Sequence, residues 1–135
     1  RDWLFVEDHA KAIDMVQEQG RLFETYNVGG HNEKQNIEII NIIIDTLQEM
    51  LPADDPRRAL VSKDLITYVE DRKGHDRRYA IAPDKIKAEI GWYPETDFAT
   101  GIKKTIAWFF EHEDWMKNVT SGDYQKYYDD MYANK

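Results

Sequence analysis

Apolar residues recur at helical spacing in two long segments of this chain. We predict a helix from about residue 36 to residue 51, with Asn36 as its N-cap, because its apolar positions share one face: Ile37, Ile40, Ile44, Leu47 and Leu51. A second helix begins after Asp97, a good capping residue, and carries a stripe that we predict to lie in the core: Phe98, Ile102, Ile106 and Phe109.

Two shorter helices are indicated mainly by their ends. Glu7 and Asp8 place two acids where a helix would begin, which suits the helix dipole, and Gly20 ends that helix after about Gln19. Pro83 suits the first position of another helix that ends near Gly91.

Short runs of aromatic and β-branched residues predict three strands, at residues 3–6, 25–28 and 66–69. The fold class is therefore α/β, with a few short strands and about four helices. From Glu111 onward the chain is acidic and rich in tyrosine, and we expect a short helix there that packs on another part of the protein.

Composition limits the classes of function. The formal net charge is −8, which argues against general nucleic-acid binding, because that binding depends on neutralising phosphates with lysine and arginine. The chain has no cysteine, so disulfides and thiolate zinc sites are excluded. No apolar run approaches the roughly 20 residues that span a bilayer, and the chain starts at Arg1 with no apolar leader, so no signal peptide is expected.

Residues 71–78 concentrate positive charge on a short stretch of this acidic chain. Arg72, Lys73, Arg77 and Arg78 surround Gly74 and His75, and arginine binds phosphate through two parallel hydrogen bonds. On charge alone, a solvated loop whose cations pair with Asp71 and Asp76 is as good an interpretation as an anion site.

Several catalytic signatures are missing. There is no Gly-x-Gly-x-x-Gly dinucleotide motif, no Tyr-x-x-x-Lys pair and no Gly-x-Ser-x-Gly. The four histidines have no metal-ligand spacing, so no metal site is predicted. We therefore expect no complete catalytic centre, no catalytic residue and no cofactor-binding residue within this chain.

Three segments in order, residues 1–9, 26–36 and 71–81, together resemble the dTDP-glucose 4,6-dehydratase family. The specific parts are Val-Gly-Gly-His-Asn-Glu at 28–33 and Gly-His-Asp-Arg-Arg-Tyr at 74–79. The resemblance covers roughly residues 1–110 and points to the C-terminal, substrate-binding part of an extended short-chain dehydrogenase/reductase, a Rossmann-type enzyme.

The resemblance implies an NAD-dependent lyase of nucleotide-sugar metabolism. In that family dTDP-glucose becomes dTDP-4-keto-6-deoxyglucose and water, a step of deoxysugar synthesis such as that of rhamnose. NAD oxidises C4, water is lost across C5 and C6, and the hydride returns at C6. NAD and the catalytic residues belong to an N-terminal Rossmann part that this chain lacks, so the chain alone is expected to be inactive.

Carried over residue by residue, the family's nucleotide contacts fall on seven positions: Arg1, Asn36, Asp71, Arg72, Lys73, Gly74 and His75. Arg77 and Arg78 are interpreted as structural or supporting. Lys73 stands where the family usually has proline, which loosens the loop. Ala82 stands where the family usually has aspartate, which weakens the cap of the following helix.

The expected organisation is a nucleotide-sugar-binding module at residues 1–113 and an acidic, tyrosine-rich tail at residues 114–135. The implied partners are dTDP-glucose, the N-terminal Rossmann part and, in the full-length enzyme, a second subunit; nucleic acid and membrane are not expected partners. The implied location is the cytoplasm. Two alternatives stay open, namely part of a related epimerase or decarboxylase, and a non-catalytic module that binds nucleotide sugars.

Overall fold

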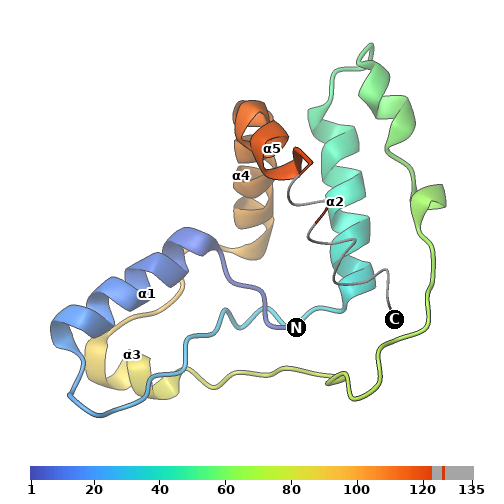
Figure 1. Cartoon of the computed structure of the whole chain (residues 1–135). Helices are drawn as coiled ribbons and strands as arrows, with labels where there is room; N and C mark the ends of the chain where they lie inside the picture. The colour runs from blue at the N-terminus through green and yellow to red at the C-terminus, as the bar shows by residue number, and fades with distance from the viewer. Residues whose placement is uncertain (123–125, 127–135) are drawn as a thin grey trace. The chain divides into compact units, whose positions relative to one another are not determined.

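In the computed structural model, which describes residues 1–122 and residue 126, helices connected by long irregular segments follow one another along the chain (Figure 1). The chain divides into two compact units, residues 1–103 and residues 104–135, which are described separately. The elements are α1 (Val6–Gln19), α2 (Asn36–Met50), the 3-10 helices η1 (Pro56–Leu60) and η2 (Lys63–Leu65), α3 (Asp84–Ile90), α4 (Phe98–Glu111) and α5 (Glu113–Thr120).

The three predicted strands are not formed among the described residues, so this part of the prediction was wrong. Residues 25–28 and 66–69 lie in irregular backbone, as do residues 3–5, and Val6 already belongs to α1. Residues with high β-propensity form a strand only where a second segment pairs with them and completes the hydrogen-bond ladder. Here one isolated antiparallel bridge, between Asp2 and Glu33, is all that the described chain provides.

The predicted helix ends are largely confirmed. Helix α1 runs to Gln19 with Gly20 as its C-cap, and α3 ends at Ile90 with Gly91 in the left-handed conformation, at φ 79°. Asp97 caps α4, since its Oδ1 accepts a hydrogen bond of 3.0 Å from the Thr100 backbone. Pro83 is the residue before α3 rather than its first helical residue.

The core of the first unit lies between α1 and α3, which pack side by side (Figure 1). Its buried members are Ala12, Ile86, Ile90 and Trp92. The Trp92 indole donates to the Asp8 carbonyl at 3.1 Å, and the buried Asp8 carboxylate accepts from the Thr96 backbone at 2.9 Å. Asp8, expected only to favour the start of the helix, therefore also ties α1 to the segment after α3.

The predicted stripe of α2 is confirmed in part, since Leu51 is buried and Ile37, Ile44 and Leu47 are half-buried. Ile39 and Thr46 are buried, whereas Ile40 is 42% exposed. The helix carries six isoleucines between residues 37 and 44, so its pattern fits more than one phase. Tertiary contacts differ around the helix: Thr46, seven residues after Ile39, lines a hollow with Phe98 and Ile102. On another side η1 and η2 run back along α2, where the Gln48 side chain donates to the Arg58 carbonyl at 2.9 Å (Figure 1).

The predicted stripe of α4 is buried in part. Phe98 and Ile102 are half-buried and Ile106 is buried, but Phe109 is 40% exposed and does not belong to a core. In the second unit, the Phe109 ring instead meets Trp108 edge to face at 5.3 Å. The short helix expected after Glu111 is present as α5, while four predicted tail residues lie outside the described part: Tyr124, Tyr127, Tyr128 and Tyr132.

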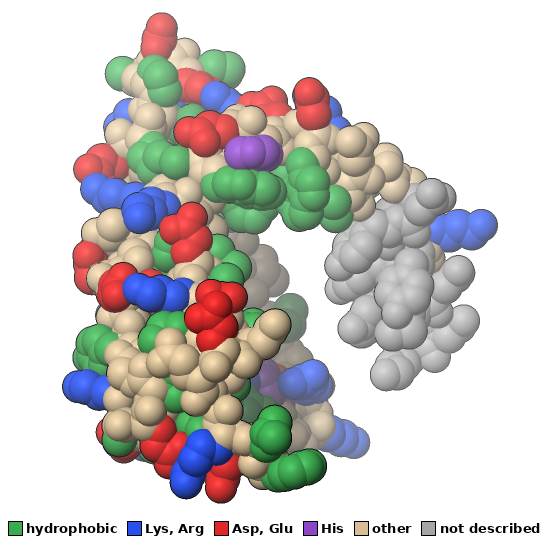
Figure 2. Space-filling model, turned by 90° about the vertical axis from the view of Figure 1, so that its left-hand side faces the viewer, with side chains coloured by type: hydrophobic (Ala, Val, Ile, Leu, Met, Phe, Trp, Pro, Cys, Tyr) green, Lys and Arg blue, Asp and Glu red, His purple; other side chains and the backbone are tan. Residues whose placement is uncertain are grey.

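Basic and acidic side chains are interspersed over the face that Figure 2 displays. Ion pairs such as Lys11–Glu95 and Arg21–Glu89, both at 2.6 Å, reflect this mixing. Exposed pairs of this kind contribute little to stability. Within the described residues, no helix is long and apolar enough to cross a membrane.

Candidate functional site

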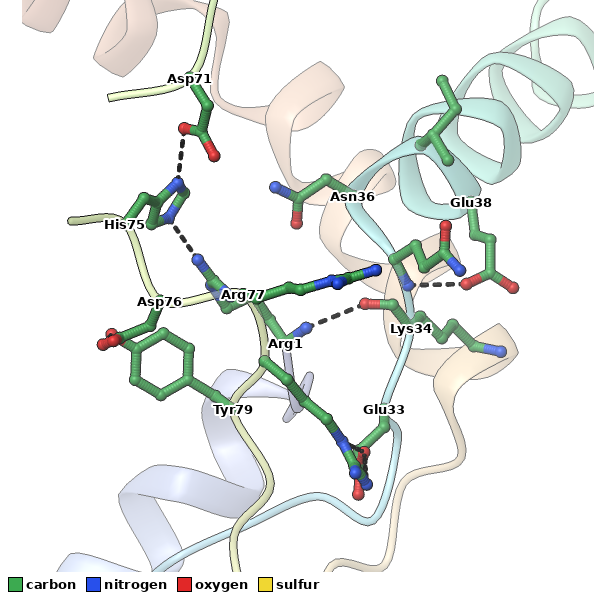
Figure 3. Close-up of a pocket in the computed structure, with 13 residues that line it drawn as sticks. Arg1, Glu33, Lys34, Asn36, Glu38, Asp71, His75, Asp76, Arg77 and Tyr79 are labelled. Carbon is green, nitrogen blue, oxygen red and sulfur yellow. Dashed lines mark hydrogen bonds and ion pairs between the residues drawn. The ribbon is translucent and has the colours of Figure 1, made fainter. Parts of the chain in front are cut away.

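An open pocket of about 710 Å³ lies in the first unit, where three segments distant in the sequence meet (Figure 3). They are the start of the chain, the entry into α2, and the loop that contains the basic stretch. The lining residues are Arg1, Glu33, Lys34, Gln35, Asn36, Ile37, Glu38, Asp71, His75, Asp76, Arg77, Arg78 and Tyr79.

Asp2 holds the first two segments together. Its two carboxylate oxygens accept hydrogen bonds from the backbones of Gly30 and Asn32, each at 2.8 Å. The Lys34 backbone N–H also donates to the Arg1 carbonyl at 3.0 Å. The Arg-Asp-Trp and Val-Gly-Gly-His-Asn-Glu motifs are therefore one structural unit that fixes Arg1 beside the entry into α2. Sequence reasoning missed this role of Asp2, although its place between Arg1 and Trp3 in the motif was the available signal.

Gly30 permits this close packing. A Cβ atom at residue 30 would lie 2.2 Å from the Trp3 carbonyl oxygen, far inside van der Waals contact. We expect Gly30→Ala to destabilise the protein by about 1–3 kcal/mol, the usual cost of forcing extra atoms into a packed site. Thermal unfolding followed by circular dichroism checks this. Phe23→Ala is the control, because the Phe23 side chain is fully exposed and its truncation removes no packed contact. Equal melting temperatures for Gly30→Ala and the unmodified protein would contradict the packing.

Arg1 is bound to the basic loop through His75. The Arg1 guanidinium contacts His75 Nε2, and His75 Nδ1 lies 2.8 Å from Asp71 Oδ1 (Figure 3). Because arginine can only donate, the contact assigns Nε2 as the acceptor and Nδ1 as the nitrogen that donates to Asp71. This hydrogen bond from His75 lowers the pKa of Asp71 below its usual value. Asp71, His75 and Arg1 thus form one hydrogen-bonded chain along the pocket wall.

Asn36 is not the N-cap of α2, which corrects the prediction. Gln35 holds that position, and its backbone N–H donates to the Glu38 side chain at 2.6 Å. Asn36 is the first helical residue and lines the pocket (Figure 3). Its amide is therefore not used for capping and is available to a ligand.

Four of the seven predicted binding residues line the pocket, namely Arg1, Asn36, Asp71 and His75. The other three occupy the exposed turn between Asp71 and His75: Arg72, Lys73 and Gly74. In this turn the His75 backbone N–H donates to the Arg72 carbonyl at 3.3 Å, and Gly74 takes the left-handed conformation. The glycine is thus required by the turn.

Four lining residues that sequence reasoning did not assign to the site follow directly after the predicted loop: Asp76, Arg77, Arg78 and Tyr79. The Arg78 guanidinium pairs with Glu33 at 2.7 Å, which agrees with a supporting role. Arg77 extends across the pocket (Figure 3). The Tyr79 hydroxyl donates to Asp76, and this hydrogen bond raises the pKa of Tyr79. The signal that could have found them is their position within the same Gly-His-Asp-Arg-Arg-Tyr motif.

The pocket is chemically suited to a phosphate-bearing ligand. Arginine edges and an asparagine amide are donors that converge on one open space, and arginine is the side chain best matched to phosphate oxygens. Among the described residues, no group of three histidine, aspartate or glutamate side chains could hold a metal ion.

Known proteins match this chain over most or all of its length. The model of a family described as GDP-mannose 4,6 dehydratase matches residues 1–105. The chain is 48% identical over all 135 residues to a dTDP-glucose 4,6-dehydratase of Shigella flexneri and to one of Escherichia coli, and it covers 36% of each. It therefore spans about a third of the length of these relatives.

Solved structures show the same similarity. A dTDP-glucose 4,6-dehydratase of Bacillus anthracis, solved in complex with NAD, matches 89% of this chain at a TM-score of 0.73 and 42% identity. One from Streptomyces venezuelae, solved with NAD bound, matches 85% at a TM-score of 0.72 and 34% identity. The chain covers 34% and 32% of these two structures, respectively.

Proposed function

This chain belongs to the GDP-mannose 4,6-dehydratase family, and from that premise we propose that it is the nucleotide-sugar-binding part of a dTDP-glucose 4,6-dehydratase. The observation that carries the proposal is the pocket, in which Arg1, Asn36 and His75 meet although they come from three separate segments. These segments are the ones through which the sequence resembles the dTDP-glucose 4,6-dehydratases.

The proposed ligand is dTDP-glucose, held mainly through its diphosphate. The Arg1 guanidinium and the Asn36 amide supply donors from opposite sides of the pocket (Figure 3). Arg72 lies on the adjoining exposed turn, and we propose that its side chain reaches a phosphate when the nucleotide is bound. Lys73 and Gly74 contribute the charge and the backbone shape of the same turn.

The whole enzyme is proposed to be an NAD-dependent lyase. When bound, NAD supplies the hydride acceptor for oxidation of the sugar. The glycine pair of this chain does not fit NAD, because the Gly30 N–H is already donated to Asp2 and a Cβ on Gly29 would lie 2.7 Å from an Asp2 oxygen. The glycine pair therefore packs against the chain itself and is not an open cradle for a pyrophosphate. We assign NAD binding and the catalytic residues to the part of the relatives that this chain does not cover.

Several further properties are part of the same proposal. The module at residues 1–113 and the tail at residues 114–135, association into a homodimer in the full-length enzyme, and a cytoplasmic location are all predictions from the family. The homodimer and the location concern the complete protein, whereas the module and the tail are divisions of this chain.

The test is turnover by the 135-residue chain, alone and combined with the part of the Escherichia coli relative that the chain does not match. We expect no 4-keto product when the chain alone is incubated with NAD and dTDP-glucose, because neither a hydride acceptor nor a base is held in place. We expect product, identified by mass spectrometry, when the two parts are mixed.

The E. coli part without the chain is the control. Turnover by the chain alone, in a preparation free of complete enzyme, would refute the assignment of the catalytic residues to the other part. A different product on mixing, such as an epimerised or decarboxylated sugar, would favour a related enzyme over the dehydratase.

A further inference from the structure

Arg1 is held on its flat face as well as at its edge. The Arg1 guanidinium carbon lies 4.4 Å from the centroid of the Tyr79 ring, within the range of a cation–π interaction. Tyr79 follows His75 in the basic loop, and both residues line the pocket (Figure 3). The two contacts reach Arg1 from different directions.

This arrangement leaves the useful donors of Arg1 free. A guanidinium carries five N–H donors around its edge, whereas an aromatic ring occupies only its face. His75 accepts from one edge nitrogen, Nη2. Stacking on Tyr79 therefore restrains the side chain without consuming a hydrogen bond that a phosphate would need.

Tyr79 is itself restrained at its far end. Its hydroxyl donates to Asp76, three residues earlier in the same loop. The loop backbone places the ring against Arg1, and this hydrogen bond is an additional restraint on the ring.

We propose that Tyr79 is a positioning residue that holds the Arg1 guanidinium ready for the diphosphate of the nucleotide sugar. The proposal rests on the function proposed above. A long arginine side chain loses rotamer freedom when it binds an anion, and a platform that restrains it beforehand removes part of that cost. Tyr79 is not one of the seven predicted binding residues. Its contact with Arg1 is a cation–π interaction and not a hydrogen bond.

The experiment compares Tyr79→Phe with Tyr79→Leu in the protein expressed from the complete reading frame that contains these residues. Calorimetry measures the binding of dTDP and of thymidine, which lacks the phosphates. We expect Tyr79→Leu to weaken dTDP binding about three- to tenfold, the loss of one cation–π contact. We expect Tyr79→Phe, which keeps the ring, to stay within about twofold of the unmodified protein. Thymidine affinity should not differ between the two variants, since it does not involve Arg1.

The Arg1→Ala background separates positioning from a general structural role. If Tyr79 acts through Arg1, then adding Tyr79→Leu to Arg1→Ala should weaken dTDP binding no further. Modification of Arg1 by phenylglyoxal, followed by mass spectrometry without any nucleotide, should be faster in Tyr79→Leu than in Tyr79→Phe. Tyr79 is 43% exposed, so both variants should fold, and Tyr79→Met provides a second non-aromatic replacement.

Three results would overturn the inference. Equal losses in the Phe and Leu variants would assign the effect to the hydroxyl and Asp76 instead of the ring. A further loss in the Arg1→Ala background would show that Tyr79 does not act through Arg1. Normal dTDP binding by Tyr79→Leu, when Arg1→Ala binds dTDP weakly, would refute the role of Tyr79 but leave the proposed function standing. If the unmodified protein does not bind dTDP, the proposed function is refuted as well.

Discussion

Replacing Arg1 by alanine is expected to weaken the binding of dTDP roughly ten- to a hundredfold. Arg1 lines the pocket, and in the part of the chain that the structure describes its guanidinium hydrogen-bonds to His75 through Nη2, one of its five N–H donors being used. Loss of a charge-assisted hydrogen bond to a phosphate costs about 1.5–3 kcal/mol, which corresponds to that change in the dissociation constant. Titration calorimetry with dTDP measures it directly.

Arg57→Ala is the matched control for this experiment. Arg57 lies in η1, outside the residues that line the pocket, and makes an exposed ion pair with Asp55 at 2.8 Å. Arg58 would be a poorer control, since its side chain donates to the Leu51 carbonyl at 3.0 Å. If Arg1→Ala and Arg57→Ala bind dTDP equally well, Arg1 is not a ligand. Adding Arg72→Ala to the series tests whether the exposed turn supplies a second arginine.

Replacing Trp92 by alanine is expected to remove most of the stability of the first unit. Trp92 is 2% exposed and lies in the core between α1 and α3, where its indole also donates to the Asp8 carbonyl. Truncation of a buried tryptophan costs about 3–5 kcal/mol, a large share of the 5–15 kcal/mol typical of a domain. The melting temperature, followed by far-ultraviolet circular dichroism, should fall by more than about 10 °C.

Phe23→Ala provides an aromatic control for the same measurement, because the Phe23 side chain is fully exposed in this chain. Its melting temperature should stay within a few degrees of the unmodified chain, since surface substitutions usually change stability by less than about 0.5 kcal/mol. A cooperative transition of Trp92→Ala at the unmodified temperature would show that α1 and α3 do not enclose Trp92.

The helix ends could be predicted because they depend on neighbours in the sequence. Gly91 follows the last turn of α3, and Asp97 reaches an N–H only three residues away. Such signals are complete within a few residues. The buried positions of α2 were harder to predict, because Ile39 and Ile40 are both apolar. Ile39 is buried and Ile40 is 42% exposed, a difference that depends on how the rest of the chain packs around the helix.

The predicted strands failed for the related reason that a strand needs a partner. Tyr68 and Val69 have high β-propensity, yet they are 83% and 84% exposed and join no ladder among the described residues. Propensity describes the backbone that a residue favours, whereas a sheet depends on a second segment being in reach.

The sequence by itself determined the helix ends to within about one residue, and its motifs singled out Arg1, Asn36 and the 71–75 loop as candidate ligands. Only the tertiary structure decided how these residues meet. His75 and Tyr79 contact Arg1 although each lies more than 70 positions away in the sequence. Asp2 accepts a hydrogen bond from the Gly30 backbone, which holds the start of the chain, and with it Arg1, beside the glycine pair. Contacts over such separations depend on the path of the whole chain between them, so no local pattern of residues encodes which side chain will hold Arg1.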